Sequence, residues 1–187
     1  MHPGRLLSAE FFNRPAEEVA PALLGKALVR QRDLKRAVHR ITETEAYVGP
    51  HDLASHAARG RTLRTEPMFG PPGCLYIYLV YGMHWMLNVV TGEIDYPAAV
   101  LIRSVETITG PGRLTRALGI TGTLNARPAS ARSGLWFSDM GEGIAPHDIA
   151  TTPRIGVGYA GPVWAAKHYR FLTTSAASVR KRAPKVR

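Results

Sequence analysis

The stretch Leu75–Asn88 restricts the fold of this chain more than any other, because it places five aromatic or imidazole rings in fourteen residues around a single glycine. Residues 75–80 are β-branched and aromatic with period-two alternation, and an apolar run resumes at His84 after Tyr81-Gly82. This pattern predicts a β-hairpin with its turn at Tyr81. The ring of Tyr81 would stand near the tip, where no neighbouring strand can cover it, so we expect it to contact a partner.

The charge of the chain indicates which partner that is. A formal net charge of +10 suits a polyanion, and a basic protein with an aromatic wedge has the features needed to bend DNA and unstack a base. The alternative is that Tyr76, Tyr78 and Trp85 belong to the core while Tyr81 only caps the turn. We therefore predict double-stranded DNA as the partner.

Length and composition favour one globular unit. The chain has 187 residues, 45% of them hydrophobic, and we expect a single domain over residues 1–178 with a basic, disordered tail over residues 179–187. Cys74 is the single cysteine, which excludes an internal disulfide, a Cys-rich zinc site and an iron–sulfur cluster. No segment approaches the ~20 apolar residues of a membrane span, so we expect a cytoplasmic, nucleoid-associated protein with no membrane contact.

The remaining chain predicts a mixture of strands and short helices. Apolar spacing favours a helix over residues 15–24, capped by Asn13 and interrupted by Pro21, and a second helix over residues 113–118 that ends at Gly119. Strands are expected at residues 27–30, 36–48, 96–105, 135–137 and 168–173.

One predicted strand carries candidate catalytic groups. In TETEAYVGP, period two places Glu43, Glu45 and Tyr47 on one face, although a merely solvated strand face would have the same pattern. Hydrolysis of a nucleotide's glycosidic bond requires a flipped base, a wedge in its place, a slot between rings and a carboxylate that deprotonates water. The candidates are Tyr81 for the wedge, Tyr47, Tyr78 and His56 for the slot, and Glu45 for the base.

Three alternatives remain open at this point. His51, Asp52 and His56 could hold a metal, although zinc would need further ligands. Glu43 and Glu45 would lie roughly 7 Å apart, which is the separation of the carboxylate pair in an inverting carbohydrate hydrolase. A non-catalytic minor-groove protein would need the charge and Tyr81 but not Glu45.

Several motifs together resemble one enzyme family. ETEAYVGPHDLASH and MFGPPGCLYIYLVYGMHWMLNVV, followed by VLIRSVE, GPGRLTRALGI and RIGVGYAG, are similar in sequence and order to the alkyladenine (3-methyladenine) DNA glycosylases. The resemblance extends from about Leu6 to Leu172. It implies a single compact α+β domain with a curved antiparallel β-sheet, flanking helices and a protruding β-hairpin that inserts into DNA.

The resemblance also implies a role for individual residues. It makes Glu45 the general base, Arg103 and the backbone of Ile155 its helpers in holding water, and Tyr81 the intercalating residue. The residues it places around the flipped base are Tyr47, His56, Tyr78 and Asn88, with Asn88 excluding the 2-amino group of guanine. His84 departs from the aromatic residue that many relatives have just after the turn.

These roles imply a monofunctional glycosylase with no lyase activity, no cofactor and no metal, acting as a monomer on damaged duplex DNA. 3-Methyladenine is the expected substrate, with 7-methylguanine, hypoxanthine and ethenoadenine as further candidates.

Overall fold

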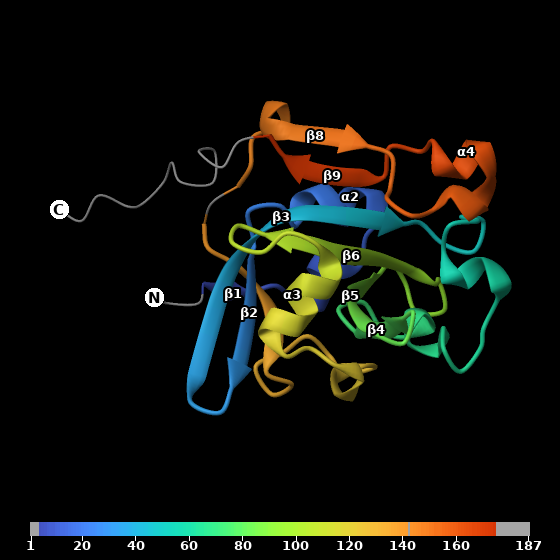
Figure 1. Ribbon diagram of the computed structural model, residues 1–187. Helices are drawn as coiled ribbons and strands as arrows, with labels where there is room; N and C mark the ends of the chain where they lie inside the picture. The colour runs from blue at the N-terminus through green and yellow to red at the C-terminus, as the bar shows by residue number, and fades with distance from the viewer. Residues whose placement is uncertain (1–3, 142, 175–187) are drawn as a thin grey trace.

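Strand β3 (Lys35–Tyr47) is the centre of a curved antiparallel sheet, around which the rest of the α+β fold is arranged (Figure 1). The computed structural model describes residues 4–141 and 143–174. The basic tail that we expect at residues 179–187 lies outside this range.

The strands follow one another in the order β1-β7-β2-β3-β6-β5-β4, and every neighbouring pair is antiparallel. Strand β9 lies along the second half of β3 and pairs on its other side with β8. The bounds of these strands are Arg5–Leu6 (β1), Ala27–Arg32 (β2), Leu75–Val80 (β4), His84–Thr91 (β5), Ala98–Val105 (β6), Leu135–Asp139 (β7), Ile149–Thr152 (β8) and Arg170–Thr173 (β9).

Strand β3 changes partners halfway along its length. Its first residues pair with β2, whereas the part from Ile41 onward pairs with β6 and β9. At the change, the pairing between β3 and β6 skips Thr42 on one strand and Arg103 on the other. Such bulges bend a strand and redirect side chains, and this one lies directly beside the two glutamates of β3.

Beyond the bulge, the two faces of the sheet have different composition. The side chains of Ala46, Val100, Val89 and Leu75 belong to the main hydrophobic core, whereas the alternate residues of the same strands carry carboxylates, phenols and an amide. This is the period-two alternation of an antiparallel sheet with one face on the core. The polar groups are therefore gathered on the opposite face.

Two helices complete the core. Helix α2 (Ala16–Ala22) contributes Val19 and Ala20, and helix α3 (Pro111–Leu118) contributes Leu114 and Leu118. The hydroxyl of Thr44 donates to the carbonyl of Ala20 over 2.8 Å and ties α2 to β3. Shorter helices are α1 (Ala9–Phe12) and α4 (Gly161–Ala165), with single 3₁₀ turns at His56–Arg59, Glu66–Phe69, Gly122–Leu124, Pro146–Asp148 and Gly158–Ala160. No helix in the described part of the chain is long and apolar enough to cross a membrane.

Several predicted boundaries are confirmed and others are wrong. Helix α3 ends at Gly119, which has a φ of 57°. Asn13 does not cap the following helix, because α2 begins after Pro15 and makes no side-chain cap. Pro21 does not divide α2, since in so short a helix it removes only one internal hydrogen bond. Strand β2 continues to Arg32, because the turn that follows it is tighter than the sequence indicates.

A pair of leucine substitutions tests which residues belong to the core and which lie on the surface. Leu114 is fully buried between α3 and the sheet, whereas Leu34 is fully exposed in the turn between β2 and β3. We predict that Leu114→Ala lowers the free energy of unfolding by about 2–5 kcal/mol through lost burial and a residual cavity. Leu34→Ala should change it by less than about 0.5 kcal/mol. Urea unfolding of both variants measures the difference, and equal losses would contradict the assigned packing.

Candidate active site

The polar face of the sheet carries a row of side chains that crosses four strands. Glu45 of β3 pairs with Leu101 of β6, Leu101 with Asn88 of β5, and Asn88 with Tyr76 of β4. Residues in register on neighbouring strands point to the same side of a sheet. The row therefore brings together residues that are distant in the chain, such as Glu45 and Leu101.

Glu45 is at one end of this row and has no exposed surface. Its Oε1 accepts the backbone N–H of Ile155 over 2.9 Å and lies 3.2 Å from Nη1 of Arg103. Its Oε2 accepts the hydroxyl of Tyr47 over 3.0 Å. Four of the residues predicted for the site are thus in direct contact, although they come from β3, β6 and the loop after β8.

The environment of Glu45 makes its carboxylate more basic than an ordinary one. Burial raises the pKa of Glu45, and the neighbouring carboxylate of Glu43 adds to the effect. The charge of Arg103 and the two hydrogen bonds act in the opposite direction without cancelling it. Burial also raises the pKa of Tyr47, so its phenol stays protonated and acts as a donor. A buried carboxylate with a raised pKa is suited to general-base catalysis.

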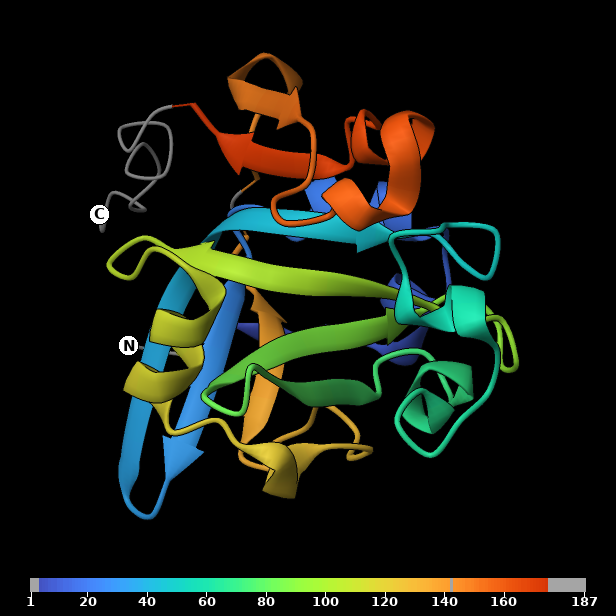
Figure 2. The ribbon, with the colours of Figure 1, turned by 45° about the vertical axis from the view of Figure 1, so that its right-hand side comes forward.

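A pocket with about 320 Å³ of empty space, part of it open to solvent, lies beside this carboxylate. Its walls come from β3, β4, β5, β6, the 3₁₀ turn at Glu66–Phe69 and the segments around residues 54–56 and 159. Figure 2 shows the last two segments near the end of β3. The lining residues are Tyr47, Ala54, Ser55, His56, Met68, Tyr76, Tyr78, Asn88, Ala99 and Tyr159.

The rings of the pocket hold one another in place. Nδ1 of His56 lies 2.8 Å from the hydroxyl of Tyr76, and its ring meets that of Tyr78 edge-on at 4.5 Å between centroids. Burial lowers the pKa of His56 to about 4, and the charges of Arg64 and Arg59 act in the same direction. The imidazole is therefore neutral at pH 7, which avoids a positive charge in the pocket wall.

Asn88 is fixed rigidly at the base of the pocket. Its side chain is buried, and its Nδ2 donates to the carbonyl of Tyr76 over 3.0 Å and to that of Met86 over 3.4 Å. An amide held by two backbone carbonyls cannot turn away from an incoming group without losing both bonds.

The Ile155 N–H is held at Glu45 by a buried ion pair that the sequence did not indicate. Arg154 donates to both oxygens of Asp52 at 2.5 and 2.9 Å, and both side chains are fully buried. Asp52 also accepts the N–H groups of Val48 and Ala54. The carboxylate considered as a metal ligand is thus used to anchor this loop. The described residues contain no group of three or more His, Cys, Asp or Glu side chains arranged for a metal.

Tyr159 is a pocket residue that sequence reasoning missed. Its side chain is 68% exposed, lines the pocket and donates its hydroxyl to the carbonyl of Ala54 over 2.8 Å. The sequence did offer a signal for Tyr159: it lies four positions after Ile155 in the glycine-rich segment RIGVGYAG.

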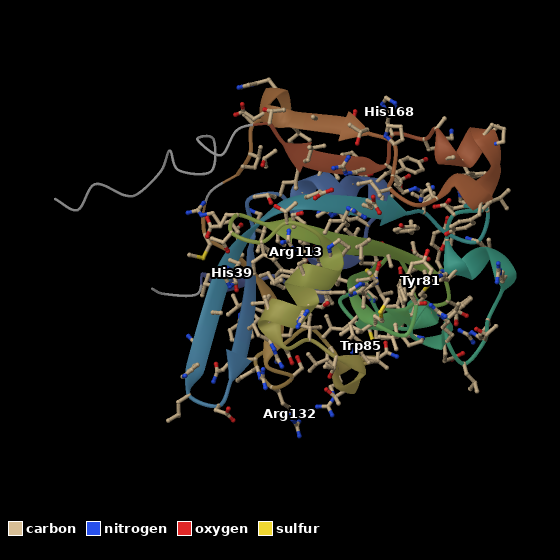
Figure 3. The ribbon with its side chains drawn as sticks, viewed as in Figure 1. His39, Tyr81, Trp85, Arg113, Arg132 and His168 are labelled. Atoms are coloured by element: carbon tan, nitrogen blue, oxygen red, sulfur yellow. The ribbon has the colours of Figure 1, made fainter. Side chains whose placement is uncertain are left out.

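Tyr81 lies apart from the pocket, in the turn that joins β4 to β5 (Figure 3). Its side chain is 87% exposed and its φ is 51°, followed by Gly82 at 67°. Left-handed backbone costs a non-glycine residue about 1–2 kcal/mol. The ring of His84, the next strand residue, packs over Gly112 at the start of α3.

Comparison with known proteins identifies the family of this chain. The family model of methylpurine-DNA glycosylase (MPG) matches residues 10–110 and 106–177 of the chain. A relative from Methanocella arvoryzae is 44% identical and covers 96% of this chain and 98% of its own length, and one from Myxococcus xanthus is 45% identical and covers 95% of each. A relative from Legionella pneumophila (strain Corby) is 43% identical and covers 89% and 93%, respectively.

Each of these relatives carries the name "Putative 3-methyladenine DNA glycosylase". The resemblance inferred from the motifs is therefore confirmed over nearly the whole chain. On the family model and the identity to these relatives, the chain belongs to the methylpurine-DNA glycosylase family.

Proposed function

We propose that this chain is a monofunctional DNA glycosylase that hydrolyses the N-glycosidic bond of alkylated purines in duplex DNA and so begins base excision repair. The proposal rests above all on Glu45, a fully buried carboxylate with a raised pKa beside a ring-lined pocket, in a member of this family. We propose 3-methyladenine as the principal lesion, with 7-methylguanine, hypoxanthine and ethenoadenine as further substrates.

In the proposed reaction, Glu45 removes a proton from water while the water oxygen bonds to C1′ of the deoxyribose. The bond from C1′ to the base nitrogen breaks, and its electron pair leaves with the base. An alkylated purine that carries a positive charge leaves as a neutral molecule, so one general base is sufficient. Arg103 and the Ile155 N–H both contact Oε1 of Glu45, and we propose that they fix this carboxylate and so help it to hold the water.

The proposal requires a small rearrangement when the substrate enters. Glu45 has no exposed surface, and the Tyr47 side chain both lines the pocket and donates to Glu45. Tyr47 therefore has to shift as the base arrives, so that water reaches the carboxylate.

The pocket is proposed to hold the flipped base between Tyr47, His56 and Tyr78, where stacking is worth about 1–3 kcal/mol per base. A neutral His56 suits this role, because a charged imidazole would repel a cationic purine. Asn88 is proposed to exclude normal guanine through the rigid amide described above.

Tyr81 is proposed to fill the gap that the flipped base leaves. A tyrosine with positive φ at an exposed turn is unfavourable for the isolated fold, and a glycine or asparagine would suit the backbone better. An unfavourable residue at a turn is a common feature of functional sites. We propose that the β4–β5 turn enters the minor groove with this ring foremost.

Neither rival function accounts for the site as well. A non-catalytic groove binder has no need of a buried carboxylate with three donors. An inverting carbohydrate hydrolase needs space between its two carboxylates, whereas Glu43 and Glu45 both contact the same Arg103 guanidinium. We further propose that the chain acts as a cofactor-free monomer with one domain, within the cytoplasm, as expected for this chemistry.

Substitution of the proposed base tests the reaction. We predict that Glu45→Gln lowers single-turnover release of 3-methyladenine from methylated duplex DNA by about 10²–10⁴-fold, because water is no longer deprotonated. Binding to the same duplex should change little, since the phosphate contacts are intact. Glu10→Gln, at an exposed position of α1, is the matched control. Unchanged release by Glu45→Gln would remove this residue from the mechanism.

Substitution of the wedge separates stability from DNA binding. Tyr81→Asn should retain or raise the unfolding midpoint, because asparagine tolerates positive φ. Its affinity for damaged duplex should fall by the loss of about 1–3 kcal/mol of stacking. Leu34→Asn, in the exposed turn of the other hairpin, serves as control. Undiminished affinity of Tyr81→Asn would exclude intercalation by this turn.

Substitution of the buried amide tests discrimination between bases. Asn88→Ser opens space at the base of the pocket, and we predict that release of normal guanine rises by about tenfold, the lower end of what a small steric change is worth. Asn13→Ser, at an exposed site, controls for the change of side chain. Guanine release that stays at the parent level would rule out the steric filter.

A further inference from the structure

Glu43 lies beside the proposed base and contacts the same Arg103, but its other contacts differ. It is 6% exposed and does not line the pocket. Its Oε1 accepts Nε of Arg103 at 2.9 Å and Nε of Arg170 at 2.6 Å, and its Oε2 accepts the hydroxyl of Ser104 at 2.5 Å. All of these donors come from other strands, β6 and β9.

The bulge explains how so many groups reach one carboxylate. In the pairing between β3 and β6, Glu43 is opposite Ser104 and Thr44 is opposite Ile102, so Arg103 is the extra residue. In a regular strand, Arg103 and Ser104 would point to opposite faces. The bulge instead lets both side chains contact Glu43. The bond from Nε to Glu43 holds the end of the Arg103 side chain in place.

Arg103 is thereby held between the carboxylates of Glu43 and Glu45, which it contacts through different nitrogens. Its Nε is bound by Glu43, which leaves Nη1 directed at Glu45. Arginine is a planar fork, so fixing one nitrogen fixes the direction of the others. Without the contact at Nε, the long side chain would be free to rotate away from Glu45.

We propose that Glu43 is a positioning residue, whose carboxylate holds Arg103 in the one orientation that serves the proposed base, Glu45. This inference rests on the proposed function, because it assigns a role within the same reaction. It distinguishes the two glutamates of the TETEAY strand, only one of which acts on water.

The pKa shifts of Glu43 and Glu45 are consistent with these different roles. Burial alone would raise the pKa of Glu43, but its hydrogen bonds from Ser104 and Arg170 and the charge of Arg103 together lower it. Glu43 therefore stays ionised over the range in which Glu45, with its raised pKa, gains and loses a proton. A permanent anion is the appropriate anchor for a guanidinium.

The variant Glu43→Gln, which keeps the shape but not the charge, tests the proposal. We expect single-turnover release of 3-methyladenine to fall by about 10–100-fold, less than for loss of a direct donor. Affinity for duplex carrying a stable abasic-site analogue should stay within a few-fold of the parent chain. Asp139→Asn removes the charge from another ion pair, with Lys26, and should leave release unchanged. A fall in affinity equal to the fall in rate would indicate general damage to the fold and overturn the proposal.

The acid limb of the pH profile of base release supplies a second, independent readout. Glu45 titrates among the ionisable groups Glu43, Tyr47, Tyr78, Arg103, Arg154 and Tyr159. If Glu43→Gln frees Arg103, Glu45 loses its strongest stabilising charge, and the limb moves to higher pH. If Arg103 stays in place, only the repulsion from Glu43 is lost, and the limb moves to lower pH. A shift downward, or no shift, would overturn the proposal.

A double substitution completes the test. In an Arg103→Gln background, Glu43→Gln should have little further effect on release, because Glu43 acts through Arg103. Full additivity of the two losses would show that Glu43 acts by another route. Failure of the parent chain to release any base would instead refute the proposed function, so the two failures are distinguishable.

Discussion

The site depends on one guanidinium shared by two buried carboxylates. Arg103 contacts Glu43 through Nε and Glu45 through Nη1, and these contacts join the central strand β3 to β6. Paired buried charges are costly to separate, because removing one partner leaves the other without compensation. The cluster therefore ties the geometry of the proposed catalytic face to the integrity of the sheet.

The two carboxylates show how position decides chemical role. Glu43 and Glu45 are two residues apart on one strand and contact the same arginine, yet their pKa values move in opposite directions. Glu43 accepts two further strong donors and stays ionised, whereas Glu45 is buried more completely and becomes the more basic group. Pairs of this kind, with pKa values pushed apart, are a recurrent feature of acid–base sites.

Local sequence pattern predicted the parts of the site that lie on single strands. Alternation placed Glu45 and Tyr47 on one face, and the cluster of rings identified Tyr78 and the exposed Tyr81. It could not place Arg103 or Ile155, which were assigned by resemblance to the family. Arg103 reaches Glu43 and Glu45 through a bulge, and bulges depend on the register between strands that are distant in sequence.

The contribution of Ile155 depends on a similarly distant contact. Its N–H reaches Glu45 because the Arg154–Asp52 ion pair fixes the loop, and the two partners of that pair are 102 positions apart in the chain. Tyr159 was missed for the same reason, since its place in the pocket wall follows from the path of this loop. The curved α+β fold, by contrast, was implied by the resemblance to the family, and periodicity and turn residues predicted the β4–β5 hairpin and the end of α3.

The most direct test of this account is a crystal structure of the chain bound to a duplex that contains ethenoadenine on a 2′-fluoro sugar, which resists hydrolysis. The account predicts the lesion base between Tyr47, His56 and Tyr78, the ring of Tyr81 in the vacated stack, and a water within hydrogen-bonding distance of both Glu45 and the backbone of Ile155. A lesion base still stacked in the duplex, or a Glu45 that remains closed off from any water, would contradict it.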